Sequence, residues 1–273
     1  MEDLDRHRHL PDGERLSTLA AMILLAYALS RYIQIPGREL SIQLPGLYFG
    51  IRFGVQELVA LIVALMTVSG ADWLLQSHPH RPNHRMVEHW VLPGITAWAI
   101  GLPLLQLPLS SAWWIGFALG GVLLILVLTA EYIVVDPQDM RRPLAGAGLT
   151  ALSFALYLVL TAAFRFSGLR LFLFIPGLTI ATFLVSLRTL RLRQPDAWLY
   201  LEAGLITLIT VQIATALHYL PLTPVRFGLA LLGPAYSLTN LFANLADGEP
   251  IRQALVEPVV VLVLITSAAL LIR

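Results

Sequence analysis

Long apolar stretches separated by short polar breaks run through the whole of this sequence. A helix that crosses a bilayer needs about 20 mostly apolar residues, because each backbone polar group must be hydrogen-bonded within the segment where water is absent. Nine such windows can be counted, at residues 16–34, 54–75, 90–107, 112–135, 144–166, 169–187, 197–219, 226–245 and 254–272. The pattern therefore predicts an all-α fold, a polytopic transmembrane helix bundle of about nine spans.

The breaks between these windows carry turn residues, as at Asp136-Pro137 and at Gly248-Glu249-Pro250. Most connections are short, and none has the length and polar composition of a water-soluble domain. We therefore predict that residues 1–273 form a single integral membrane domain, in which residues 1–15 are a short polar cytoplasmic N-terminus.

One connection has a different pattern. Between residues 40 and 51, apolar and polar positions alternate on both sides of Pro45-Gly46, which is typical of a hairpin. We predict a small extracytoplasmic β-hairpin at residues 40–52. The alternative is an irregular amphipathic loop, because a lone hairpin is marginally stable in water.

The composition strengthens the membrane assignment. Of the 273 residues, 57% are hydrophobic and 13% are charged, whereas about 25% of residues are charged in a soluble domain. The net charge of +1 gives no basis for a nucleic-acid partner. The expected partners are the lipid bilayer and other membrane proteins or further copies of the chain.

The chain contains no cysteine and no lysine, and this absence excludes several chemistries. A disulfide and a cysteine-ligated iron–sulfur cluster both need cysteine, and a Schiff base needs lysine. Haem is also disfavoured, because His218 has no second histidine at a matching depth. We therefore predict no cofactor, apart from the metal alternative considered below.

Arginine placement predicts the orientation. With the N-terminus inside, eleven arginines fall on the inner side and seven on the outer side, as the positive-inside rule favours. We predict a multi-pass protein of a bacterial-type cell membrane with its N-terminus in the cytoplasm. The alternative is cleavage of the first window at Ala26-Tyr27-Ala28, which would leave eight spans, although the acidic leader opposes it.

Four of the acidic residues inside the predicted spans lie within about two turns of the inner end: Asp72, Glu131, Glu202 and Glu257. Charged groups at such positions are candidates for function. They could line the inner mouth of a cavity, or they could form interfacial ion pairs with arginines of the adjoining loops. The second interpretation is preferred, because groups near the headgroups reach water at small cost.

The window at 226–245 is the most polar span. Its Asn240, together with Gln212 on the preceding window and Glu257 on the next, could converge on a pocket for a solute. Small residues elsewhere, at Gly116, Gly120 and 145–148, predict close helix packing instead.

The inner loop at 78–89 carries the densest cluster of metal-ligating side chains: His78, His80, His84 and His89, with Glu88 beside them. Imidazole binds zinc and iron well. The spacing matches no metalloenzyme motif, however, so a loop facing the headgroups is preferred and metal binding is the alternative.

No motif of a catalytic nucleophile or phosphate-binding loop is present, so an enzyme is not favoured. Our first hypothesis is a protein that binds or transports a small or lipid-like solute. A second is a scaffold or accessory subunit of a membrane complex. A third is an enzyme that acts on a lipid at the cytoplasmic interface through His84, Glu88 and His89 beside Arg141 and Arg142.

Overall fold

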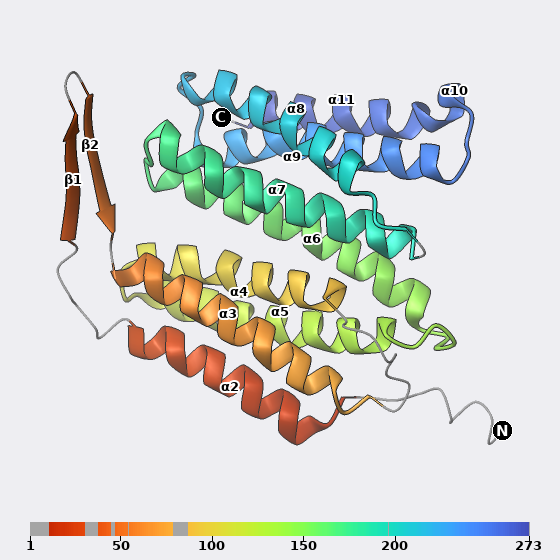
Figure 1. Cartoon of the computed structure of the whole chain (residues 1–273), viewed down its shortest axis with the longest axis horizontal. Helices are drawn as coiled ribbons and strands as arrows, with labels where there is room; N and C mark the ends of the chain where they lie inside the picture. Colours follow the sequence, from red (N-terminus) through yellow and green to blue (C-terminus); the bar gives the residue numbers. More distant parts are fainter. Residues whose placement is uncertain are drawn as a thin grey trace.

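The computed structural model describes residues 11–30, 38–44, 47–53, 55–78, 87–195 and 197–272. Within these ranges the chain forms long helices and one small sheet (Figure 1). In chain order the elements are α2 (Gly13–Ser30), β1 (Arg38–Leu44), β2 (Leu47–Phe53), α3 (Val55–Leu75), α4 (Glu88–Gln106), α5 (Ser111–Val134), α6 (Arg142–Phe166), α7 (Leu171–Arg193), α8 (Tyr200–His218), α9 (Pro224–Ala246), α10 (Ile251–Ala254) and α11 (Val256–Leu271).

A long helix occupies each window that the apolar pattern predicted. Five segments in the described part of the chain are long and apolar enough to cross a membrane: Ser111–Val134, Arg142–Phe166, Leu171–Arg193, Tyr200–His218 and Ile251–Leu271. The structure therefore supports a helical protein with several membrane-type helices, and the count of nine spans stays a prediction.

The helices lie side by side in two groups, as Figure 1 shows. One group contains α2, α3, α4 and α5, and the other contains α6, α7, α8, α9 and α11. Helix α4 contacts α6 and α7 and so joins the two groups. An apolar cluster crosses this junction, because Leu92 of α4, Tyr157 of α6, Phe174 of α7 and Phe227 of α9 all belong to it.

Glycines allow close contacts within the first group. A Cβ atom at Gly101 of α4 would lie 2.8 Å from Cε1 of Tyr27 on α2. The Tyr27 hydroxyl donates a hydrogen bond to the carbonyl oxygen of Ala97 at 2.5 Å. A Cβ atom at Gly120 of α5 would lie 2.6 Å from Cγ2 of Ile100, so the prediction of close packing is confirmed at this glycine.

The same prediction is wrong for the small residues at the start of α6. A Cβ atom at Gly146 or Gly148 would meet no heavy atom within 4 Å, and Ala147 is exposed. Gly146 instead lies in the wall of a groove that residues of α5, α6 and α7 line and that is described below. Small residues on a helix therefore border open space here, where the sequence pattern predicted a helix contact.

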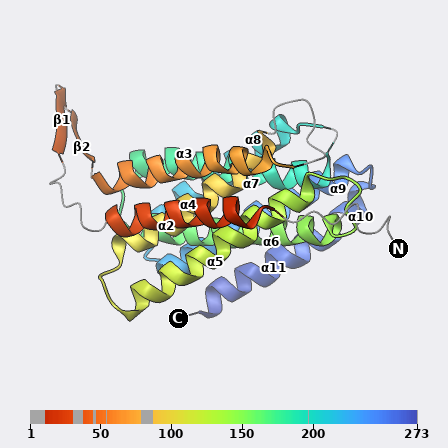
Figure 2. The same cartoon turned by 90° about the horizontal axis from the view of Figure 1, so that it is seen from below.

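The two strands form an antiparallel sheet between α2 and α3, with Arg38 opposite Phe53 and Leu44 opposite Leu47. The turn residues 45–46 lie outside the described residues. Figures 1 and 2 show the sheet beyond the helices, at the end of the bundle where α3 begins.

Two arginines near the end of the bundle at which α8 finishes bind carbonyl groups at the ends of helices. Arg165 donates to the carbonyl oxygens of His218 at 2.8 Å and Leu220 at 2.7 Å. Arg226 donates to the carbonyl oxygen of Leu270 at 2.8 Å. The last carbonyls of a helix lack partners within it, and a cation beside them is favourable. These arginines therefore complete the ends of α8 and α11.

Candidate functional site

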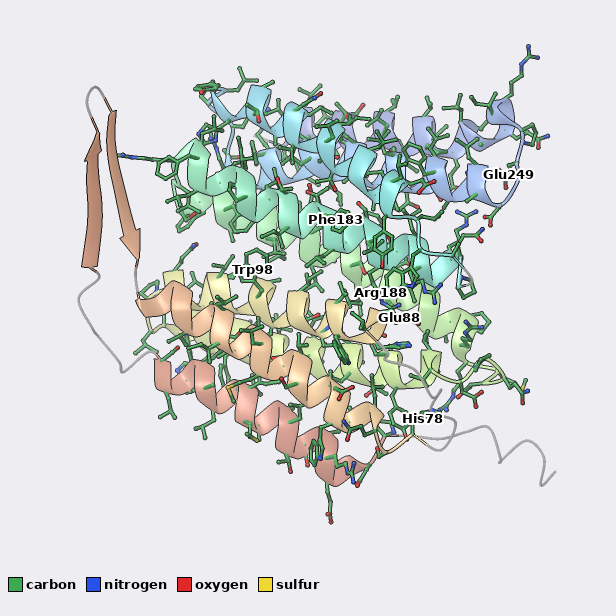
Figure 3. All side chains as sticks on the ribbon, in the orientation of Figure 1. His78, Glu88, Trp98, Phe183, Arg188 and Glu249 are labelled. Carbon is green, nitrogen blue, oxygen red and sulfur yellow. The ribbon has the colours of Figure 1, made fainter. Side chains whose placement is uncertain are left out.

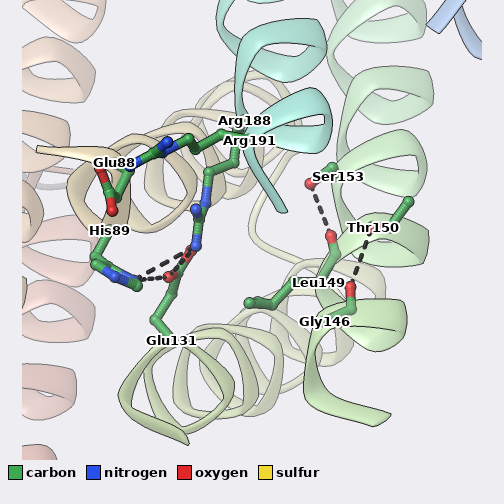
Figure 4. Close-up of polar contacts among 9 residues, drawn as sticks. All are labelled: Glu88, His89, Glu131, Gly146, Leu149, Thr150, Ser153, Arg188 and Arg191. Carbon is green, nitrogen blue, oxygen red and sulfur yellow. Dashed lines mark hydrogen bonds and ion pairs between the residues drawn. The ribbon is translucent and has the colours of Figure 1, made fainter. Parts of the chain in front are cut away.

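Three polar side chains from three helices meet between the two helix groups. His89 lies at the start of α4, Glu131 near the end of α5 and Arg188 near the end of α7. Arg188 donates from Nε to Glu131 Oε1 at 3.1 Å and from Nη2 to Glu131 Oε2 at 2.5 Å. His89 Nδ1 lies 2.7 Å from Glu131 Oε2 (Figure 4). We call these three residues the buried triad.

The three side chains of the buried triad are almost completely inaccessible to solvent. His89 is 6% exposed, Glu131 1% and Arg188 3%. An ion pair at such a position needs good geometry and further hydrogen bonds to offset the loss of water. The two-pronged contact of Arg188 supplies that geometry. An ionised carboxylate can only accept hydrogen bonds, so His89 donates from Nδ1, and its Nε2 has no hydrogen bond within the described ranges.

The sequence pattern positions Arg188 on the buried side of α7. Phe174, Leu178, Ala181, Val185 and Arg188 are all buried and follow the three- and four-residue spacing of one helix face. Our sequence interpretation missed Arg188, because the predicted window ended at residue 187 and the arginine was counted as part of a positive inner loop. The continued spacing of the buried face was the signal that could have found it.

A cavity of about 190 Å³ opens beside the triad. His89 and Arg188 lie in its wall, together with Glu88, Arg142 and Arg191. Figure 3 shows Glu88 and Arg188 in the space between the two helix groups. The cavity therefore lies among α4, α5, α6 and α7, at the end of the bundle opposite the small sheet.

The arginines of the cavity differ in how far they are neutralised. Arg188 is paired with Glu131 within the triad. Arg191 Nε lies 3.6 Å from Glu88 Oε2, beyond hydrogen-bond distance, and this buried nitrogen has no hydrogen-bond partner among the described residues. Arg142 forms no ion pair with any residue that the structure describes, so it supplies the surplus positive charge of the cavity.

Arg141 is bound differently, although it is the neighbour of Arg142. Arg141 donates from Nη2 to Asp139 Oδ2 at 2.7 Å, and the hydrogen bonds to Asp139 raise the pKa of the Arg141 guanidinium. The enzyme hypothesis placed both arginines in one site. The structure brings Glu88, His89 and Arg142 to the cavity, whereas Arg141 is engaged by Asp139.

A groove of about 380 Å³ continues from the cavity along α6. Arg142, Val134 and Leu192 border both spaces, and the groove extends past Gly146 and Thr150. The Thr150 hydroxyl donates to the Gly146 carbonyl oxygen at 3.0 Å, as Figure 4 shows. The donor of this hydroxyl therefore has its hydrogen-bond partner within α6, so it needs no partner in the groove.

The predicted acidic residues have separate surroundings. Of the four acidic residues named from the sequence, Glu131 is the one that belongs to the buried triad. Asp72 accepts hydrogen bonds from Gln76 at 2.7 Å and from the Trp90 indole at 3.2 Å, and so links α3 to α4. Glu257 is exposed in the first turn of α11, on the side of Tyr236. Glu202 lies half-buried in the first turn of α8 and has no ion pair within the described ranges.

The residues proposed for a pocket around α9 are not all directed to one place. Asn240 accepts a hydrogen bond from Arg193 at 2.8 Å, and Arg193 also pairs with Asp247 at 2.8 Å. Gln212 is exposed on α8. These contacts of Arg193 therefore tie the C-terminal ends of α7 and α9 together.

The histidines between residues 78 and 89 do not form one cluster in the part of the chain that the structure describes. His78 is buried and its ring lies 4.6 Å from that of Tyr132, while His89 belongs to the triad. His80 and His84 lie outside the described residues. Among the residues that the structure describes, no group of three or more metal-ligating side chains is positioned to hold a metal ion.

The comparisons with known proteins give one match. A family model described as "Protein of unknown function (DUF5656)" matches residues 35–272, which include every residue of the triad, the cavity and the groove. No curated protein and no solved structure matches the chain.

Proposed function

The chain belongs to DUF5656, a family of proteins of unknown function, and we propose that it is a multi-pass membrane protein that binds an anionic solute in the cavity beside the buried triad. The observation that carries this proposal is Arg142, which lies in the wall of the cavity and forms no ion pair with any residue that the structure describes. A guanidinium presents five donors and suits carboxylate and phosphate groups. An anion is the ligand that such a charge favours.

Two further groups support an oxyanion at this position. Arg191 Nε has no hydrogen-bond partner among the described residues, and His89 Nε2 is likewise left over when Nδ1 binds Glu131. Both residues line the cavity with Arg142. An oxyanion with several oxygens can accept from more than one of these groups, and it meets them in a partly dry space where such bonds are strong.

The triad supports the proposal by fixing the other side of the cavity. Glu131 neutralises Arg188, so the charge available to a ligand comes from Arg142 and Arg191. Glu88 lies in the same wall and offsets part of the charge of Arg191. The residues that line the cavity therefore carry a small net positive charge.

The proposed topology places this cavity at the cytoplasmic face. Nine spans with the N-terminus inside would put the end of α5, the start of α6 and the end of α7 together on the inner side. The sheet of β1 and β2 would lie on the outer side. The arginine distribution along the sequence supports this orientation.

An enzyme that acts on an anionic lipid at the same cavity is the second candidate. Glu88, His89 and Arg142 line one space, and His89 has a free ring nitrogen that could exchange a proton with a bound group. A scaffold role remains the third hypothesis and predicts no ligand in the cavity.

Thermal unfolding of the detergent-purified protein tests the proposal. A ligand that binds only the folded state raises the unfolding temperature. Inorganic phosphate should stabilise the wild-type protein more than sodium chloride of equal ionic strength. Arg142→Gln should weaken the affinity for phosphate by about tenfold or more and so reduce the rise in unfolding temperature, since a hydrogen bond to a charged group contributes about 1.5–3 kcal/mol.

Arg252→Gln is the matched control, because Arg252 is exposed on α10 and is not among the residues that line the cavity. This variant should respond to phosphate like the wild type. An equal response of wild type and Arg142→Gln would overturn the proposed anion site.

A further inference from the structure

The groove beside the cavity indicates what kind of anion the site takes. On the basis of the proposed anion site, we infer that the ligand is a phospholipid with an anionic headgroup, whose phosphate lies at Arg142 and one of whose two acyl chains lies along α6 past Gly146 and Thr150. The cavity and the groove share Arg142, Val134 and Leu192. A ligand with a charged end and an apolar end would occupy both.

The depth of the two spaces fits a lipid. The cavity is lined by residues at helix ends, such as Glu88 at the start of α4 and Val134 at the end of α5. Helix ends lie at the level of the headgroups in a spanning bundle. From Arg142 to Thr150 the helix rises by about 12 Å, so the groove leads from headgroup level toward the acyl-chain region.

The lining of the groove fits an acyl chain. Val134 and Leu192 supply apolar walls, and Gly146 leaves a space that a Cβ atom would enter without meeting a heavy atom within 4 Å. The hydroxyl of Thr150 is bonded to the Gly146 carbonyl oxygen. An apolar chain can therefore lie against this face without leaving that hydroxyl unsatisfied.

The charge at the entrance favours an anionic lipid over a zwitterionic one. Arg142 is the arginine of the shared wall that has no acidic partner in the described chain, and Arg193 at the groove is paired with Asp247. A headgroup that also carries a positive charge would bring that charge toward Arg142, Arg188 and Arg191. A phosphate with no cation attached avoids this repulsion.

Native mass spectrometry of the detergent-purified protein tests the inference, with long-chain phosphatidic acid and phosphatidylcholine supplied in equal amounts. The wild type should retain phosphatidic acid preferentially. Gly146→Leu should fill the groove and lower this retention by about tenfold or more, as expected when two or more methylene groups lose their burial. Its thermal response to inorganic phosphate should remain, because Arg142 is intact.

Gly148→Leu is the matched control. Gly148 also lies in open space, two residues further along α6, and is not among the residues that line the groove. Both substitutions place a good helix former in the same helix. Phosphatidic acid retention by Gly148→Leu should equal that of the wild type.

The outcomes separate the inference from the proposed function. Equal retention by Gly146→Leu and wild type, or retention of phosphatidylcholine equal to that of phosphatidic acid, would overturn the lipid while the phosphate response keeps the anion site. Loss of the phosphate response in Gly146→Leu would contradict the inference that the acyl chain and the phosphate occupy different parts of the site. An unchanged phosphate response in Arg142→Gln would overturn the proposed anion site, and with it the inference that the ligand is a lipid.

Discussion

Glu131 of α5 and Arg188 of α7 form a two-pronged ion pair that crosses the boundary between the two helix groups. The two residues are 57 positions apart in the sequence and almost completely buried. His89 of α4 hydrogen-bonds to the same carboxylate. One carboxylate thus connects three helices of the bundle, and the cavity wall is built on this connection.

Removing the charge of Glu131 should destabilise the fold severely. Glu131→Gln leaves the buried guanidinium of Arg188 without its counter-charge, which costs about 3–5 kcal/mol in comparable cases. The double variant Glu131→Leu with Arg188→Met should recover part of this loss, because an apolar pair of similar volume needs no desolvation of charge, whereas His89 Nδ1 still loses its acceptor. Unfolding in increasing concentrations of SDS measures both. A single variant no less stable than the double would contradict this account.

A second ion pair offers a contrast. Arg193 and Asp247 lie 2.8 Å apart, but their side chains are 39% and 32% exposed. Solvent screens such pairs, so Asp247→Asn should cost less than about 1 kcal/mol in the same unfolding measurement. A loss as large as that of Glu131→Gln would show that the C-terminal ends of α7 and α9 depend on this contact.

The close contact between α2 and α4 predicts a large effect of one methyl group. In Gly101→Ala the new Cβ atom would lie 2.8 Å from the Tyr27 ring, so either the ring or the helix must shift. Overpacking of this kind costs about 1–3 kcal/mol. Gly148→Ala, in open space on α6, should instead gain about 0.5–1 kcal/mol from its helix propensity. Thermal unfolding followed by tryptophan fluorescence compares the two, and similar values would argue against the contact.

The absence of cysteine allows the proposed topology to be tested with single introduced thiols. Met140, between α5 and α6, is 74% exposed, and Tyr219, after α8, is 77% exposed. In intact cells, a membrane-impermeant maleimide should label Tyr219→Cys and should label Met140→Cys only after lysis. The reverse result would invert the orientation. Labelling of both from outside would mean that α6, α7 and α8 do not cross the membrane three times.

The helices were predictable to a large degree because an apolar run of bilayer length has few other structures open to it. The ends of the helices were less predictable. The sequence interpretation ended the helix of Arg188 at residue 187, whereas α7 continues to Arg193. The free-energy cost of moving a charged residue into the membrane favours placing it outside a predicted span. For Arg188 this cost is offset by the counter-charge of Glu131, which lies on another helix.

The residues of the candidate site were predictable, but their grouping was not, because it depends on contacts between helices. Glu131 was singled out as an acid near a span end, and Glu88, His89 and Arg142 were named in the enzyme hypothesis. Their grouping depends on how α4, α5, α6 and α7 pack, and that arrangement is not encoded in the spacing along one helix. The small residues at Gly146 illustrate the limit: the same composition borders a close contact at Gly120 and a groove at Gly146.

The ion pair between Glu131 and Arg188 also bears on the order in which the protein is made. In the proposed topology α5 enters the membrane before α7. The carboxylate of Glu131 therefore has no partner until Arg188, 57 residues later in the sequence, has been synthesised. At a synthesis rate of about 5–20 residues per second, this interval is roughly 3–11 s. During that time the first helix group carries an uncompensated acid near the inner membrane surface. The second group therefore completes the first, and a fragment that ends before α7 would lack the partner that its own buried acid requires.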